Sequence, residues 1–430
     1  MLKRCVFALS LMILNPALAL AQGDLPKPEN RDITDTKTIS LEDALKRVYQ
    51  HSPQIWKLRA DYKLWDARIL QAGLGPNPEL SLVAEDILGS AAFTSDRFTQ
   101  VTLGLAQNIV LGDKLHFRTR LAQFKQQLQY WDYLVQVQDL GTQVYTHYAQ
   151  LLNLQAEQTL LQDLIANAQS THQLLSLSVA HGKLAPSVLY QSELTLKSLE
   201  AEQYQLGIKH NIGRQNLAAL WGETRSDFVL ALPATAMPMG SFEQFKQALE
   251  QHPRLARWQL EQEQRQWAVK AAQAESVSDV NLSGGLRYHA PLDWGLVLSL
   301  NWALPVTNLQ QGHLEEARQR QAMWQKEQEI EVQSLEQSLL QNYEMTMAYQ
   351  QLRELLKHQV QLADLQQSTV QKAFKAGKIS YLEVLQAAQH WMQQYRQLQT
   401  AEAEFRLARW KLEGLSHNAL VQLAVQDKGL

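Results

Sequence analysis

The feature of the sequence that most constrains the fold is the stretch 313–376, which lies between Gly312 and Gly377 and contains neither glycine nor proline. As one continuous helix it would be about 96 Å long, whereas ordinary globular helices have about 8–20 residues. Its residues are mostly good helix formers. Apolar residues recur mostly at steps of three and four and form one stripe: Leu335, Leu339, Tyr343, Met347, Leu352 and Leu355. The stretch therefore predicts either a structural coiled coil or an extended helical barrel.

The N-terminus has the pattern of a secretory signal peptide over residues 1–21. Lys3 and Arg4 precede an apolar core at 6–14, and small residues follow up to Ala21, so cleavage after Ala19 or Ala21 is expected. The core is too short to span a bilayer, which needs about 20 apolar residues. Cys5 is the only cysteine and lies inside this segment. We therefore expect the mature protein to have no thiol and no disulfide.

Charge and hydropathy give no indication of a nucleic-acid-binding protein or of a helical membrane protein. The formal net charge of −3 gives no indication of a nucleic-acid partner. No apolar run after the signal reaches 18 residues, so we expect no transmembrane helix. An exported chain could still enter a membrane through β-strands, whose signal per segment is much weaker.

The rest of the chain has two repeats with the same order of parts: a helix, a pair of strands, a long helix and a return helix. One helix begins at Ser40 and is expected to continue past Pro53; a second begins at Ser241 and continues past Pro253. The expected segments are a polar lead (22–39), a first repeat (40–232), a linker (233–240), a second repeat (241–415) and a C-terminal tail (416–430).

Within these repeats we expect strands at about 79–109 and 280–303 and long helices at about 114–180 and 313–376. Gly141 is the only interruption of the first long helix. Both long helices end in the same turn, at Gly182-Lys183 and at Gly377-Lys378. Glycine suits the left-handed position after a helix, and lysine suits the negative end of the helix dipole. Return helices are expected at about 187–221 and 381–415.

The second strand pair alternates between apolar and polar residues. Leu282, Leu286 and Tyr288 share a face, as do residues 294–302 at every second position, whereas Arg287 and Asn301 lie on the opposite face. Tyr288 and Trp294 flank the turn and Trp302 lies at the far end, as the two aromatic girdles of a transmembrane strand require. The alternative is a half-buried hairpin of a soluble domain. Because four strands cannot close a barrel, further strands would come from copies of the chain.

From about residue 40 to 415 the sequence resembles the TolC-type outer-membrane channels of tripartite efflux pumps. The resemblance rests on these residues: the repeated helix starts, Gly75-Pro76-Asn77-Pro78, and the Gly-Lys turns followed by Pro186-Ser187-Val188-Leu189 and Tyr381-Leu382-Glu383-Val384-Leu385-Gln386-Ala387. Within this family, residues 110–114, 304–306 and 311–317 look most like the CzcC branch, which serves heavy-metal efflux.

The resemblance implies a mainly α-helical homotrimer with a membrane β-barrel contribution. Four strands per subunit would close a 12-stranded barrel in the outer membrane of a Gram-negative bacterium, above a long periplasmic α-barrel. The turns at Gly182, Lys183, Gly377 and Lys378 would contact a periplasmic adaptor protein and, through it, an inner-membrane pump of the RND type.

Related channels commonly place two aspartates at the periplasmic entrance, six and nine residues after the second tip glycine. Here these positions are Glu383 and Gln386, of which only Glu383 keeps the carboxylate. The alternative for Glu383 is a glutamate that favours a helix start through the dipole.

Motifs of enzymes and of metal or cofactor sites do not occur in the sequence. It has no glycine-rich phosphate loop, nucleophile elbow or zinc-protease motif, and no two histidines are spaced three or four residues apart. Met345 and Met347 lie on different faces of a helix and are expected to pack in a core. We therefore expect that the protein is not an enzyme and has no cofactor. The resemblance implies a passive exit channel for heavy-metal cations. The alternatives are a channel for drugs, other organic compounds or a secreted polypeptide, and a periplasmic structural coiled coil.

Overall fold

The computed structural model describes residues 37–87, 99–224, 227–231, 240–289, 293–416 and 419–426. The expected signal peptide, most of the polar lead and most of the linker lie outside these ranges, and the bounds of the two repeats stay a prediction. All of the described residues belong to one compact unit.

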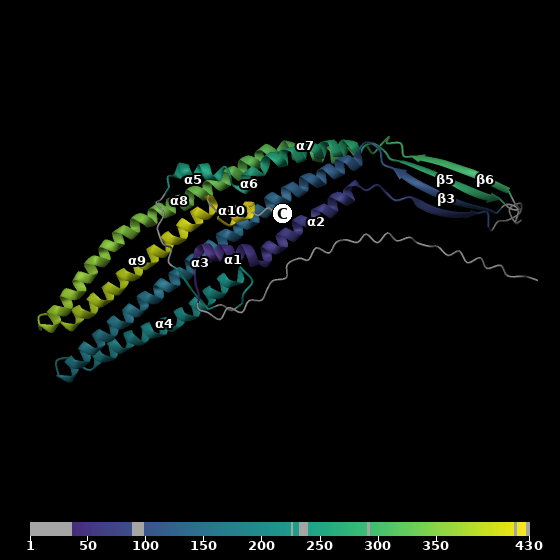
Figure 1. Cartoon of the computed structure of the whole chain (residues 1–430). Helices are drawn as coiled ribbons and strands as arrows, with labels where there is room; N and C mark the ends of the chain where they lie inside the picture. Colours follow the sequence, from purple (N-terminus) through teal and green to yellow (C-terminus); the bar gives the residue numbers. More distant parts are fainter. Residues whose placement is uncertain are drawn as a thin grey trace, which may run out of the picture. The chain divides into compact units, whose positions relative to one another are not determined.

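A four-stranded antiparallel sheet continues directly into a layer of helices (Figure 1). The strands lie in the order β2-β3-β5-β6. Helix α2 leads into β2, β3 leads into α3, α7 leads into β5, and β6 leads into α8. The helices pack in the same order, α2 on α3, α3 on α7 and α7 on α8. The bounds are α2 (Pro53–Gly73), β2 (Glu79–Glu85), β3 (Gln100–Ile109), α3 (Lys114–Ala180), α7 (Trp258–Ala274), β5 (Val280–His289), β6 (Asp293–Trp302) and α8 (Gln311–Lys375).

Each long helix turns back into a return helix at the end away from the sheet (Figure 1). Helix α3 packs along α4 (Ser187–Ala219), and α8 packs along α9 (Tyr381–Ser416). The duplicated order predicted from the sequence is thus confirmed. Gly141 does not interrupt α3: the helix continues through this residue, which is buried.

The helices that open the two repeats differ from the prediction, because neither continues past its proline. Helix α1 (Leu41–His51) ends before Ser52, whose φ of −63° and ψ of 124° are extended, and Pro53 begins α2. In the second repeat α5 (Phe242–Leu249) ends before α6 (Pro253–Ala256), which is followed by α7. Proline disfavours a helical conformation of the residue before it but suits the first helical position.

The main core lies around the middle of α3 and includes elements that were not predicted. Strands β1 (Lys37–Ile39) and β4 (Phe228–Leu230) pair in parallel, and helix α10 (Ala419–Gln426) packs on α3. The hydroxyl of Tyr148 lies 2.9 Å from the carbonyl oxygen of Ile39 and 2.8 Å from that of Ala231. This core therefore ties both ends of the first repeat to the C-terminal helix. Across the described ranges, no helix is long and apolar enough to cross a membrane.

Candidate channel surfaces

One face of the four-stranded sheet is apolar and exposed on all four strands. The strand register aligns Leu80 with Leu105, Leu103 with Leu286, and Leu286 with Leu296, so these side chains lie on one side of the sheet. Leu298 is 73% exposed. Such a contiguous apolar surface indicates contact with lipid or with another protein.

The three predicted interface anchors lie on this apolar face, at its two ends. Trp294 pairs in register with Tyr288, and their ring centroids are 5.3 Å apart. Trp302 pairs with Val280 at the end near the helices. Trp294 and Trp302 are both exposed. The strand geometry thus suits the predicted role at two membrane interfaces, which stays a prediction.

The opposite face of the sheet is polar, as the alternation of the sequence predicted. Asn281 pairs with Asn301, Ser283 pairs with Ser299, and Arg287 lies on the same side. The guanidinium of Arg287 reaches across β3 to Glu85 of β2, with 3.2 Å between the charged groups. Sequence reasoning did not find this partner, because Arg287 and Glu85 come from different repeats.

The two predicted tips have the same backbone geometry. Gly182 and Gly377 have φ angles of 69° and 68°, which glycine adopts without steric cost. In each turn the glycine and the following lysine donate backbone hydrogen bonds to the last turn of the long helix: Gly182 to Val179, Lys183 to Ser178, Gly377 to Phe374 and Lys378 to Ala373. The two turns therefore have equivalent backbone conformations, and their predicted contact with an adaptor protein stays a prediction.

Glu383 and Gln386 both lie exposed in the first turns of α9. The carboxylate of Glu383 accepts hydrogen bonds from the backbone nitrogen of Ser380 at 3.2 Å and from its hydroxyl at 3.0 Å. This is the glutamate half of a capping box, which the Ser380-x-x-Glu383 spacing could have indicated. Glu383 thus has a role at the helix start, and its predicted role at the entrance is compatible with its exposure.

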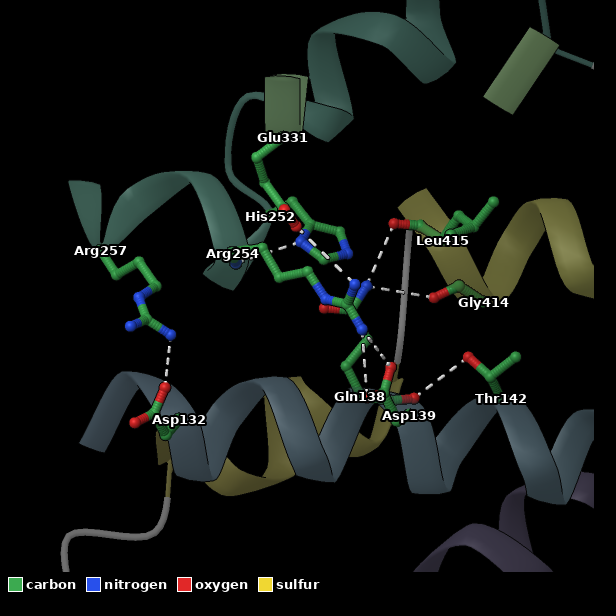
Figure 2. Close-up of polar contacts among 10 residues, drawn as sticks. All are labelled: Asp132, Gln138, Asp139, Thr142, His252, Arg254, Arg257, Glu331, Gly414 and Leu415. Atoms are coloured by element: carbon green, nitrogen blue, oxygen red, sulfur yellow. Dashed lines mark hydrogen bonds and ion pairs between the residues drawn. The ribbon is translucent and has the colours of Figure 1, made fainter. Parts of the chain in front are cut away.

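Helix α6 joins the two long helices through ion pairs (Figure 2). Arg254 lies 3.2 Å from Asp139 of α3 and 3.7 Å from Glu331 of α8. Arg257, the residue directly after α6, pairs with Asp132 of α3. Because each pair is partly exposed, it contributes only about 0.2–1 kcal/mol, and Arg254 is the side chain among them that contacts both α3 and α8.

Two buried polar side chains complete this junction (Figure 2). The Nδ1 atom of His252 accepts the backbone N–H of Arg254 at 3.2 Å and so caps α6. Burial, with a smaller effect of Arg254, lowers the pKa of His252 to about 4. The side-chain nitrogen of Gln138 donates to the carbonyl oxygens of Gly414 and Leu415, at 3.3 and 3.1 Å, and so caps the end of α9.

A second link joins the two helical hairpins nearer their tips. Arg396 of α9 forms two hydrogen bonds, of 2.6 and 2.7 Å, to the carboxylate of Glu202 on α4. Within the part of the chain that the structure describes, no group of three or more histidine, cysteine or acidic side chains could hold a metal ion.

Known proteins are similar to this chain in sequence or in structure. The cobalt-zinc-cadmium resistance protein CzcC of Cupriavidus metallidurans is 25% identical over 396 residues, which cover 88% of this chain and 90% of that protein. The crystal structure of CusC, described in terms of transmembrane channel formation, has a TM-score of 0.71 at 13% identity and covers 91% of this chain and 96% of its own. The open state of the MtrE outer membrane channel of Neisseria gonorrhoeae has a TM-score of 0.70 at 14% identity, with 93% and 98% covered.

The two repeats also match one family separately. Residues 44–223 and 245–416 both match the sequence model of the outer membrane efflux protein family. These two segments contain the long helices, the return helices and all four strands of the large sheet. The chain therefore belongs to the outer membrane efflux protein family.

Proposed function

We propose that this protein is the outer-membrane exit channel of a tripartite efflux system, that it acts as a passive conduit without enzymatic activity, and that its cargo is heavy-metal cations. The observation that carries the proposal is the four-stranded sheet, with one exposed apolar face and one polar face, whose strands continue into the helix layer. The apolar face fits lipid, and the polar face fits a water-filled lumen.

The proposed assembly is a homotrimer. Strands β2 and β6 form the two edges of the sheet, and edge strands carry backbone groups that can pair with another chain. Closed barrels need at least about eight strands, so one chain is too small. Three copies joined through these edges give twelve strands, as the resemblance implies. Helices α2 and α8, which lie at the two edges of the helix layer, would then meet between neighbouring copies on the periplasmic side of the membrane.

The two tips, which have the same backbone conformation, are the proposed sites of contact with partner proteins. Gly182-Lys183 and Gly377-Lys378 are proposed to contact a periplasmic adaptor protein, which links the channel to an inner-membrane pump of the RND type. Glu383 is proposed to lie at the periplasmic entrance, with Gln386 one turn further along α9. Three copies of Glu383 would form an acidic ring, which favours cations.

Support for a metal cargo comes from the relative CzcC, which is named for resistance to cobalt, zinc and cadmium. The test is complementation of a strain that lacks its own channel of this class, with growth measured in cobalt, zinc and cadmium salts and, separately, in organic dyes and detergents. The proposal predicts restored tolerance of the metal salts. Restored tolerance of the organic compounds alone would assign the channel to drug export.

Localisation tests the channel itself. Cell fractionation should find the folded protein in the outer membrane. Recovery of the folded protein from the soluble periplasm alone would favour a structural coiled coil and refute the channel.

A further inference from the structure

The polar face of the sheet carries one permanent positive charge. Arg287 is the only lysine or arginine within the four strands β2, β3, β5 and β6. Elsewhere on this face the side chains of Ser81, Ala106, Ser283, Val297 and Ser299 are uncharged, and Glu79 carries a carboxylate in register with Ala106, at the end of β2 near the helices. Arg287 lies near the end of β5 that is farther from the helices. A single fixed cation in this position is unexpected in a channel for cations.

The guanidinium of Arg287 is held on the polar face by three residues of two other strands. Its Nε donates to the hydroxyl of Thr102 at 2.9 Å, one terminal nitrogen donates to the side-chain oxygen of Gln100 at 3.0 Å, and the other lies 3.2 Å from the carboxylate of Glu85. Gly295, its register partner on β6, presents no side chain. The charge of Arg287 is therefore directed to β3 and β2 and lies beside Glu85.

The ion pair of Arg287 and Glu85 is suited to setting the net charge of the polar face more than to stabilising the fold. The side chains of Arg287 and Glu85 are 30% and 48% exposed, and partly solvated ion pairs contribute little to folding. Asp293 also lies on this face at the same end, in register with His289. With Arg287 cancelling Glu85, the strand residues here leave one net negative charge per subunit, from Asp293.

We propose that Arg287 is a selectivity-determining residue, which neutralises Glu85 at the outer end of the lumen and so keeps exported divalent cations from being retained there. The inference rests on the proposed function, because it requires that the polar face lines the lumen. Without Arg287, no lysine or arginine of the four strands would offset Glu85 and Asp293 in any of the three subunits. Conduction requires binding weak enough for the ion to leave, and such a group of carboxylates would hold a divalent cation at the exit.

The test is single-channel recording of the purified protein in planar bilayers, with four variants: Arg287→Gln, Glu85→Gln, the double variant, and Arg287→Lys. At low ionic strength we expect Arg287→Gln to raise the cation-to-anion permeability ratio about two- to five-fold and Glu85→Gln to lower it by a similar factor, because charges near the lumen wall are partly screened by water and salt. Zinc added at the outer side should block Arg287→Gln at lower concentrations than the unmodified channel.

Two variants separate the charge of Arg287 from its structural role. The double variant restores the net charge, and Arg287→Lys keeps it while losing the planar hydrogen-bonding geometry. Both should therefore have the permeability ratio and zinc block of the unmodified channel. If all four variants conduct and have the same permeability ratio and zinc block as the unmodified protein, the inference is overturned and the proposed function still stands. If the unmodified protein itself never conducts, the proposed function fails, and the inference fails with it.

Discussion

Replacing Leu298 by arginine tests which face of the sheet contacts lipid. Leu298 is the sixth residue of the ten-residue strand β6 and lies on the exposed apolar face. At about 3.3 Å per residue the strand is about 33 Å long, and at a tilt of about 40° it spans about 25 Å, the height of the apolar band of a membrane barrel. In the proposed membrane barrel Leu298 would therefore lie near the middle of the bilayer.

A lipid-facing arginine at the midplane costs about 2–4 kcal/mol, which would amount to about 6–12 kcal/mol over the three subunits of the proposed trimer. The matched control is Ser299→Arg, the next residue on the same strand, whose side chain lies on the polar face opposite Ser283. This arginine would be hydrated in the lumen and should cost little. A second control, Leu298→Ala, removes the side chain without adding charge.

The assay is the fraction of protein that remains in isolated outer membranes after extraction with urea. We expect Leu298→Arg to lose most of the membrane-integrated protein, and Ser299→Arg and Leu298→Ala to retain nearly all of it. Equal retention of the two arginine variants, or a greater loss with Ser299→Arg, would refute the assignment of the two faces.

Three further predictions concern the helices. Glu383→Gln can still form the capping box but removes the charge, so it should lower cation preference in single-channel recordings without changing the thermal stability; an unchanged preference would leave Glu383 only its role at the helix start. His252 has a lowered pKa, so the native state binds fewer protons than the unfolded state between about pH 4 and 6.5. The contribution of His252 to the free energy of unfolding should therefore fall by up to about 3 kcal/mol as the pH decreases through this range. The variant His252→Asn, which can also cap α6, should make the urea-unfolding midpoint less dependent on pH in this range. Gly182→Ala should destabilise the tip by about 1–2 kcal/mol because of its positive φ, whereas Gly207→Ala within α4, where a Cβ also meets nothing within 4 Å, should stabilise by about 0.5–1 kcal/mol; equal effects in thermal unfolding would contradict this reasoning.

The parts of the fold that could be predicted are those with a long periodic signal. The apolar stripe along residues 313–376 repeats over many helical turns. The alternation of apolar and polar residues extends over two whole strands, β5 and β6, so each pattern is long enough to stand out from chance. By contrast, β1 and β4 have three residues each, too few for any periodicity, and they pair across the whole first repeat. Helix α10 is also short and depends on packing against the middle of α3.

The polar contacts could be predicted only where they are local in sequence. The cap formed by Ser380 and Glu383 was readable from its spacing. The pair of Arg287 with Glu85 depends on the register between β3 and β5, which belong to different repeats, and no turn connects these strands directly. The bridge from Arg254 to Asp139 and Glu331 depends in the same way on how α6 lies between two long helices. Such contacts follow from tertiary packing and leave no signal in a single sequence.

We propose that copies of this chain close an open sheet into a membrane channel through the edges β2 and β6. Native mass spectrometry of the protein released from isolated outer membranes tests this closure, because it counts the chains in the intact assembly. We expect three copies of the chain and no folded monomer in the soluble periplasm. A folded single chain, or an assembly whose four-stranded sheets could not complete a 12-stranded barrel, would contradict it.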